Sequence, residues 1–306
     1  MYYLLCVDFK KQELVKMNVL SLFNGMSTGH TALDNVGIKV DKYYSSEIKP
    51  DAIKLTQHHY PDTIQLGDVT KWEEWDINWK EIDMVLSGSP CQDLSIAGKR
   101  KGLKGERSGL FFTFIDILNH IKKYNTNVLF LQENVGSAPR EDIGIMSREL
   151  GVYPVLINSS LVSAQLRKRY YWSNIKTRKE GLFGDIVTDI PLPKDRKILL
   201  EDIIEDGYVL QKKANCLLES ESRPCVSNRR RFRRWKIGAF VTIVFTKKPL
   251  SPFFNRCLSQ LELERLQGFP DNWTHILNRN DAASLLGDGW TLPVIEHIFS
   301  FIKENK

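Results

Sequence analysis

Residues 18–29, Asn-Val-Leu-Ser-Leu-Phe-Asn-Gly-Met-Ser-Thr-Gly, decide the fold. The apolar first half predicts a buried strand, and Gly25 and Gly29 predict a tight turn into a helix over residues 28–36. The glycine spacing is GxxxG and not GxGxxG, which argues against a dinucleotide site and a Rossmann-type oxidoreductase. No Walker lysine follows, so a nucleoside triphosphate is not expected either.

The segments after this turn alternate between strand and helix patterns. The predicted strands cover residues 42–47, 64–66, 83–87, 127–131 and 153–157, and the predicted helices cover residues 50–59, 110–123 and 140–150. Such alternation implies a parallel sheet covered by helices on both faces. The fold class is therefore α/β, and a ligand is expected at the carboxyl ends of the strands.

The alternation stops near Asn174, and the sequence divides the chain into four parts. Residues 1–16 contain no motif and are interpreted as an extension without function before Met17. Residues 17–175 form the main domain, and residues 176–258 form a smaller domain with an irregular pattern. Residues 259–306 return to the sheet through a helix over 259–267, with Ser259 as cap and Glu262 completing a capping box, and a last helix over 293–303.

Composition excludes several classes of protein. No apolar run approaches the roughly 20 residues that a bilayer span needs, so no membrane association is expected. The five cysteines are odd in number and lack CxxC spacing, which argues against a disulfide framework and a zinc site. The histidines form no HExxH motif, so no metal is expected. Cysteine usage favours a reducing cytosol and hence a cytoplasmic protein.

The positive charge is concentrated in the smaller domain. Residues 176–255 contain 17 Lys and Arg against 10 Asp and Glu, while the whole chain contains 43 against 37. A local basic excess is typical of a protein that binds a polyanion, although a solvated basic loop has the same composition. The run at 229–236, Arg-Arg-Arg-Phe-Arg-Arg-Trp-Lys, is the densest part of this excess.

Two acids and one apolar residue near the first turn are suited to bind a nucleoside without phosphates. Glu47 ends the second strand, where an acid can accept hydrogen bonds from ribose hydroxyls. Asp68 follows the third strand and could accept from an adenine amino group, with Val69 against the ring. S-adenosyl-L-methionine is the common ligand of this kind, although a tight turn without any ligand would use the same glycines.

The segment at 83–95, Asp-Met-Val-Leu-Ser-Gly-Ser-Pro-Cys-Gln-Asp-Leu-Ser, contains a candidate nucleophile. A lone cysteine is usually a small buried hydrophobe, but Cys91 follows a central strand and precedes a loop rich in glycine and lysine. That loop suits a lid that closes over nucleic acid. Its candidate phosphate contacts are Lys99, Arg100, Lys101, Lys104 and Arg107.

Two further segments supply charged partners. Glu133 follows the fifth strand at the same edge of the sheet as Cys91. Arg167 and Arg169 are two residues apart at the start of a strand and so face the same way. Taken alone, Glu133 with Arg169 would be interpreted as a structural ion pair.

Taken together, these motifs resemble the cytosine-5 DNA methyltransferase family over residues 18–302. They stand in the family's order: FNGMSTG, the acid in SSEI, GDV, GSPCQDLS, QENV, QLRKR, LERLQGFP and GDGWTLPVI. The spellings LSLFNGMSTG, SPCQDLSIAG, RSGLFF and WTLPVI are most similar to the catalytic domain of animal de novo DNA methyltransferases. The small size is more similar to phage and bacterial enzymes.

The resemblance implies a Rossmann-like S-adenosylmethionine-dependent methyltransferase sheet with a target-recognition domain, and double-stranded DNA as substrate. Cys91 would add to carbon 6 of a flipped cytosine, Glu133 would hold or protonate nitrogen 3, and Arg169 with Arg167 would bind the base oxygen. Asn134 would brace the Pro-Cys loop. The positions that match the cofactor site are Phe23, Asn24, Gly25, Met26, Thr28, Glu47, Ile48, Asp68, Val69, Pro90, Asp288 and Trp290. The DNA contacts expected in the basic run are Arg229, Arg230, Arg231, Arg233 and Arg234.

Two positions depart from the family pattern, and two alternatives stay open. Asn24 stands where the animal enzymes have Asp, which should weaken a contact to the cofactor's charged amino group. Asp288 stands where much of the family has Asn, and its carboxylate could contact the same amino group instead. The alternatives are an RNA cytosine-5 methyltransferase acting on tRNA and a catalytically inactive DNA-binding relative. The resemblance is compatible with a cognate restriction enzyme in the host, but no stable protein partner is expected.

Overall fold

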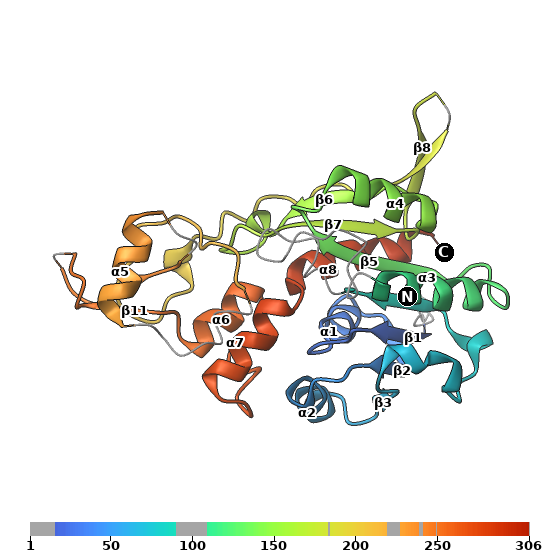
Figure 1. The fold of residues 1–306 in the computed structure, drawn as a ribbon, viewed down its shortest axis with the longest axis horizontal. Helices are drawn as coiled ribbons and strands as arrows, with labels where there is room; N and C mark the ends of the chain where they lie inside the picture. The colour runs from blue at the N-terminus through green and yellow to red at the C-terminus, as the bar shows by residue number, and fades with distance from the viewer. Residues whose placement is uncertain are drawn as a thin grey trace, which may run out of the picture.

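The computed structural model describes residues 16–89, 109–182, 184–218, 227–238, 241–248 and 250–305. A seven-stranded sheet with the order β3-β2-β1-β4-β5-β7-β6 forms its centre (Figure 1). Its strands are β1 (Lys16–Leu22), β2 (Lys39–Ser46), β3 (Ile64–Gln65), β4 (Met84–Ser87), β5 (Leu129–Val135), β6 (Val155–Asn158) and β7 (Lys168–Ser173). β1 begins two residues before the predicted strand, with Lys16 paired to Lys39.

Alternating side chains of the strands build two apolar layers, one on each face of the sheet. Val19, Leu86 and Leu131 face a layer that includes residues of α1 (Thr28–Asn35), α2 (Pro50–His59) and α8 (Leu292–Phe299). Leu20 and Phe130 face the opposite layer, with residues of α3 (Gly109–Lys122) and α4 (Arg140–Leu150). Period-two burial on both faces confirms the predicted α/β sandwich.

The sheet is mixed, so the prediction of a purely parallel sheet was wrong at one strand. β7 runs antiparallel to both β5 and β6, and the other pairings are parallel. Pairing with β7 also extends β5 to Val135, beyond the predicted end at residue 131. Glu133 and Asn134 therefore lie inside a strand, where the ladder fixes their backbone.

Two small β units and one helix follow the sheet in the chain. The hairpin β8 (Thr177–Glu180) and β9 (Asp185–Thr188) projects from the sheet, and α5 (Asn228–Lys236) lies beside β10 (Val244–Phe245) and β11 (Asn255–Arg256). In Figure 1, α5 and β11 lie at the end of the molecule opposite the hairpin. The helix α5 corrects the prediction that residues 182–254 are irregular throughout.

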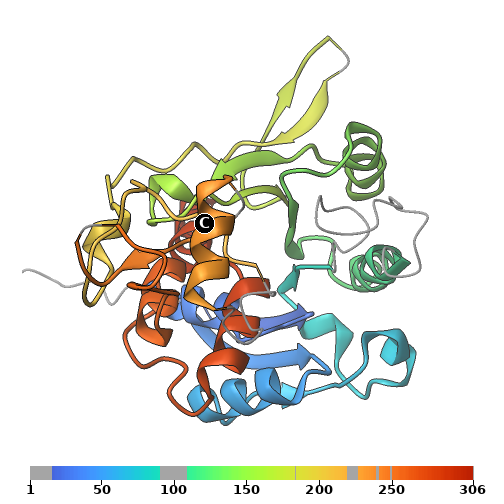
Figure 2. The same ribbon diagram turned by 60° about the vertical axis from the view of Figure 1, so that its left-hand side comes forward.

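Three helices carry the chain back to the sheet: α6 (Gln260–Gln267), α7 (Arg279–Asp288) and α8. Figure 1 shows α6 and α7 between α5 and the sheet, and Figure 2 shows the hairpin of β8 and β9 projecting away from them. The predicted capping box of α6 is confirmed, because Ser259 Oγ accepts from Glu262 N and Glu262 Oε2 accepts from Ser259 N. Short 3₁₀ segments complete the described structure: Val69–Glu74, Trp79–Glu81, Ser159–Leu161, Leu200–Asp202 and Ser300–Asn305.

A buried polar cluster attaches this return segment to the sheet. Gln165 Nε2 donates to Gln267 Oε1 at 2.8 Å and to Leu266 O at 3.1 Å. Thr291 Oγ1 donates to the same Gln267 oxygen at 2.9 Å, and all three polar residues are buried. Because buried polar groups need partners, this cluster fixes α6 and the start of α8 against the segment before β7.

Two further findings concern expectations from composition. Cys216 is a free thiol, whereas Cys257 is disulfide-bonded. The argument against disulfides from the odd cysteine count therefore does not hold for Cys257. In the part of the chain that the structure describes, no helix combines the length and hydropathy needed to cross a bilayer.

Candidate active site

Glu133 of β5 is the central acid of the site. It is 9% exposed, and each of its carboxylate oxygens has a donor. Arg169 Nε lies 2.7 Å from Oε1, and Trp290 Nε1 donates to Oε2 at 3.1 Å. A buried carboxylate is tolerated only with such partners, so β7 and the segment before α8 together make the position stable for a charged group.

The two arginines of the QLRKR motif have different surroundings. Arg169 is partly exposed, while Arg167 is buried, and burial lowers the pKa of Arg167, which stays charged. Arg167 donates to Leu217 O at 2.9 Å, to Gly289 O at 2.9 Å and to Gly287 O at 3.2 Å. Arg167 thus holds together segments far apart in the sequence, and it lies next to the arginine that pairs with the acid.

The end of β4 brings the chain to this acid. A Cβ on Gly88 would lie 2.8 Å from Trp290 Nε1, so only glycine lets the strand end pass the indole. Gln132 Nε2 donates to Ser89 Oγ at 3.0 Å, which connects β5 to the last described residue of this segment. Ser89 is two residues before Cys91 in the sequence.

Several predicted site residues lie outside the described residues. These are the predicted nucleophile, its neighbour and the loop cations: Cys91, Pro90, Lys99, Arg100, Lys101, Lys104 and Arg107. Before them, the described segment ends at Ser89, beside Gln132 and close to the Trp290 indole that contacts Glu133.

Asn134 has one hydrogen-bonding group in use and one without a partner. Its Oδ1 accepts from Val135 N at 2.7 Å. Its Nδ2 is buried and has no hydrogen-bond partner among the described residues. An unpaired buried donor costs about 1–3 kcal/mol, so this amide is suited to an acceptor that the described residues do not supply.

The turn after β1 has the strained backbone expected of a close approach to a ligand. Phe23, Gly25 and Ser27 have φ of 56°, 57° and 59°. A Cβ on Gly25 would meet no heavy atom within 4 Å, so open space faces this residue. Gly25 N donates to Glu47 Oε2 at 2.8 Å, which brings together two predicted cofactor positions 22 residues apart.

Three more predicted cofactor positions lie at the ends of β2 and β3. Ile48 is 70% exposed directly after β2. Asp68 is exposed and accepts hydrogen bonds from Thr70 N and Oγ1, which lower the pKa of Asp68. Val69 is buried beside it. Of these three residues, Ile48 and Asp68 are accessible and Val69 is not.

The remaining predicted cofactor positions differ in accessibility. Met26 and Thr28 are buried, and so is Asn24, whose Nδ2 donates to Ser27 Oγ at 2.7 Å and whose Oδ1 accepts from Tyr43 OH at 3.0 Å. Asn24 thus supports the turn from within. Asp288 is half exposed at the end of α7, with its Oδ2 2.5 Å from Lys49 Nζ.

The basic run of α5 separates into one buried and four exposed arginines. Arg231 is buried, and its Nη1 donates to Asn255 Oδ1 and Asn228 Oδ1, both at 3.1 Å. The exposed arginines are Arg229, Arg230, Arg233 and Arg234. Phe232 and Trp235 pack against Phe245, as the pattern predicted for the layer beneath them.

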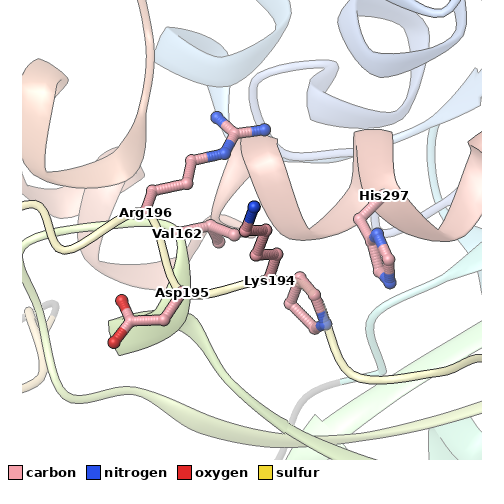
Figure 3. A pocket seen from close by; sticks show the side chains of 6 residues that line it. Val162, Lys194, Asp195, Arg196 and His297 are labelled. Atoms are coloured by element: carbon pink, nitrogen blue, oxygen red, sulfur yellow. The ribbon is translucent and has the colours of Figure 1, made fainter.

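A separate hollow lies away from these residues. It measures about 530 Å³ and is lined by Val162, Pro193, Lys194, Asp195, Arg196 and His297 (Figure 3). None of the predicted site residues lines it, so it is not part of the candidate active site.

The sequence did not identify the glutamines that support the site. Gln132 precedes the acid, and Gln165 and Gln267 stand inside QLRKR and LERLQGFP, but only burial shows that they bind segments together. The contact between Trp290 and Glu133 was also missed, because 157 residues separate them.

Strand order, the single reversed strand and an acid at the carboxyl edge define an S-adenosylmethionine-dependent methyltransferase fold. The crystal structure of the Dnmt2 methyltransferase of S. pombe is similar, with a TM-score of 0.65, 16% identity, and coverage of 95% of this chain and 99% of that one. The family profile described as C-5 cytosine-specific DNA methylase matches residues 17–221 and 205–304. The chain therefore belongs to this family.

Two curated relatives are bacterial or viral methyltransferases. The orphan methyltransferase M.Rho11sI of Bacillus phage rho11s is 29% identical over 250 residues, which cover 68% of this chain and 48% of that one. The type II methyltransferase M1.ScrFI of Lactococcus lactis subsp. cremoris is 26% identical over 322 residues, or 95% of this chain and 79% of the relative. The chain thus spans about half the length of the phage relative.

Proposed function

We propose that this protein is a DNA (cytosine-5)-methyltransferase that acts on a flipped cytosine of double-stranded DNA. The observation that carries the proposal is the arrangement of Glu133, Arg169 and Trp290 at the end of β4, which ends four residues before Cys91. A carboxylate held by a cation, together with a cysteine a few residues after the neighbouring strand, would serve addition to a pyrimidine ring.

The chemistry assigns separate tasks to these side chains. The Cys91 thiolate forms a bond to carbon 6 while Glu133, in its protonated form, donates a hydrogen bond to nitrogen 3 or transfers its proton there, which draws electrons from the ring. Arg169 binds the base oxygen and keeps Glu133 in place. Loss of the proton from carbon 5 then restores the double bond and releases the cysteine. The base must leave the helix first, at a cost of a few kcal/mol in unstacking.

S-adenosyl-L-methionine fits the turn after β1 and supplies the methyl group that carbon 5 accepts. The open space at Gly25, the exposed Ile48 and the exposed carboxylate of Asp68 support this assignment. Glu47 would bind the ribose hydroxyls, Trp290, Phe23 and Val69 would line the site, and Asp288 would attract the amino group. The buried Asn24, Met26 and Thr28 would shape the turn from within.

Recognition of the target would involve the smaller domain. The four exposed arginines of α5 would contact phosphates or guanine edges, while the buried Arg231 would hold α5 to β11. In the loop after Cys91, Lys99, Arg100, Lys101 and Arg107 would contact the backbone. Asn134, whose buried Nδ2 has no hydrogen-bond partner among the described residues, would brace the Pro-Cys segment.

Expression in a host that lacks cytosine methylation tests the proposal. Bisulfite sequencing of the host DNA should reveal 5-methylcytosine in one short motif, and the Cys91→Ser variant should leave the DNA unmethylated. Methyl incorporation into RNA but not DNA would instead support the RNA methyltransferase. DNA binding without any methylation would support the inactive relative.

A further inference from the structure

Among the described residues, the carboxylate of Glu133 has two donors of different kinds, a cation and an indole. Arg169 reaches Oε1 from β7, the strand next to β5. Trp290 reaches Oε2 from the segment between α7 and α8, at 3.1 Å. An indole N–H donates and never accepts, so this contact defines the direction of one lone pair of Oε2. The other position on Oε2 would hold the proton that Glu133 donates toward nitrogen 3 of the base.

The indole itself is held in place by contacts on both sides of its backbone. Arg167 donates to Gly287 O and Gly289 O, immediately before Trp290. A Cβ on Gly289 would lie 2.7 Å from Met26 Cε, so this residue packs tightly on the turn after β1. After it, Thr291 is anchored to Gln267.

The segment just before Trp290 also contains a predicted cofactor position. Asp288 is two residues before Trp290 and pairs with Lys49, next to Glu47. The segment at 287–290 therefore extends from the candidate cofactor site to the acid. Trp290 therefore contacts Glu133 from a segment that also pairs with the candidate cofactor site through Asp288.

We propose that Trp290 is a positioning residue for the reaction, whose indole N–H orients Glu133 toward the base. The inference rests on the proposed function and adds a role for Trp290 beyond lining the cofactor site. A hydrogen bond to a charged group contributes on the order of 1.5–3 kcal/mol, which corresponds to about a 10- to 100-fold effect on rate.

Trp290→Phe removes the N–H and keeps a ring against Gly88. We expect kcat to fall about 10- to 100-fold, with the KM for DNA, the Kd for S-adenosylhomocysteine and Tm unchanged. Trp273→Phe is the matched control, because the Trp273 indole is also packed on a ring, 3.7 Å from His59, and its buried N–H has no partner among the described residues. Its kcat should equal that of the wild type.

A double-mutant cycle separates positioning from packing. If Trp290 acts through Glu133, Trp290→Phe should cause no further loss of kcat in a Glu133→Ala background. A full additional loss in that background, or a weakened Kd for S-adenosylhomocysteine with kcat unchanged, would overturn the proposal.

A spectroscopic measurement works even if the enzyme proves inactive. In ¹⁵N-labelled protein, the Trp290 Nε1–H resonance, assigned with Trp290→Phe, should shift upfield in Glu133→Ala, and the Trp273 resonance should not move. An unchanged Trp290 resonance contradicts the proposal. Absence of methyl transfer by the wild type, with the shift present, would refute the proposed function alone.

Discussion

Two groups of arginines, one before and within β7 and one on α5, differ in what surrounds them. Arg167 and Arg169 lie among acceptors from the sheet and the return segment, and Arg169 meets a buried acid. On α5, one arginine is buried against Asn255 and four face solvent. In each group a buried arginine holds segments together and leaves its neighbours accessible. Charge count alone therefore does not identify which cations meet a substrate.

Replacement of Glu133, the acid that pairs with Arg169 of the first group, should have the largest effect on the methylation rate. Glu133→Gln keeps the shape of the side chain and removes the acid, so the methylation rate should fall about 10²- to 10⁴-fold. Tm should fall only modestly, since the amide oxygen can still accept from one of the two donors, Arg169 or Trp290, while the amide nitrogen cannot accept from the other. Single-turnover kinetics with thermal unfolding provide the measurement. A collapse of Tm with activity in proportion to folded protein would mean that Glu133 is only a structural ion-pair partner.

Replacement of the buried arginine of the first group, Arg167, should lower stability more than replacement of an exposed arginine elsewhere in the chain. Arg167→Met leaves buried carbonyls at residues 217, 287 and 289 without their donor, at about 1–3 kcal/mol for each. We expect Tm to fall by roughly 5 °C or more. Arg178→Met, which breaks exposed ion pairs with Glu180 and Asp189, is the control and should change stability by under about 1 kcal/mol. Equal stability of both variants would contradict the distinction.

Protonation of histidine should act outside the segment at 176–258, because all six histidines lie outside it. His30 is stacked between Tyr43 and Tyr60, and burial lowers its pKa to about 4. The unfolded chain binds the proton near pH 6.5, so stability is full above that pH and is lost as the pH falls toward 4, by about 3 kcal/mol. Urea unfolding of wild type and His30→Phe from pH 7 to pH 4 measures this loss. Parallel pH curves would exclude His30 as its source.

On α5, single substitutions should have the smallest effects. Arg233→Ala removes an exposed cation and should weaken DNA binding at every site, with the salt slope lowered by about 1. A variant that instead relaxes the methylated motif at one position would identify a base contact. Arg231→Ala should lower Tm, because Asn255 loses its donor. If all four exposed arginines can be replaced without effect on affinity or motif, α5 is a solvated surface and recognition lies elsewhere.

The sequence predicted most of the sheet because the elements are local patterns. α2 and α4 begin and end at the predicted residues, and the capping box of α6 needs only four adjacent positions. The reversal of β7 and the extension of β5 depend on pairing between distant strands, which no local period reveals. The helix α5 was missed because six cations in nine residues hide its apolar side.

The site was predictable only as a set of motifs. Glu133 and Arg169 were paired in advance because both motifs end or begin strands at one edge. The roles of Arg167, Arg231 and Asn24 as internal supports depend on burial, which residue type does not determine. For Trp290, the sequence suggested a cofactor contact, and the structure adds a bond to the acid from across the chain.

Covalent trapping tests the central claim most directly. The wild-type protein would be incubated with DNA that carries 5-fluorocytosine and with S-adenosylmethionine, and the adduct mapped by peptide mass spectrometry. Fluorine cannot leave carbon 5 as a proton does, so we predict a denaturation-stable adduct on Cys91 that is absent in Cys91→Ser. An adduct on any other cysteine, or methylation of unmodified DNA by Cys91→Ser at the wild-type rate, would contradict the account.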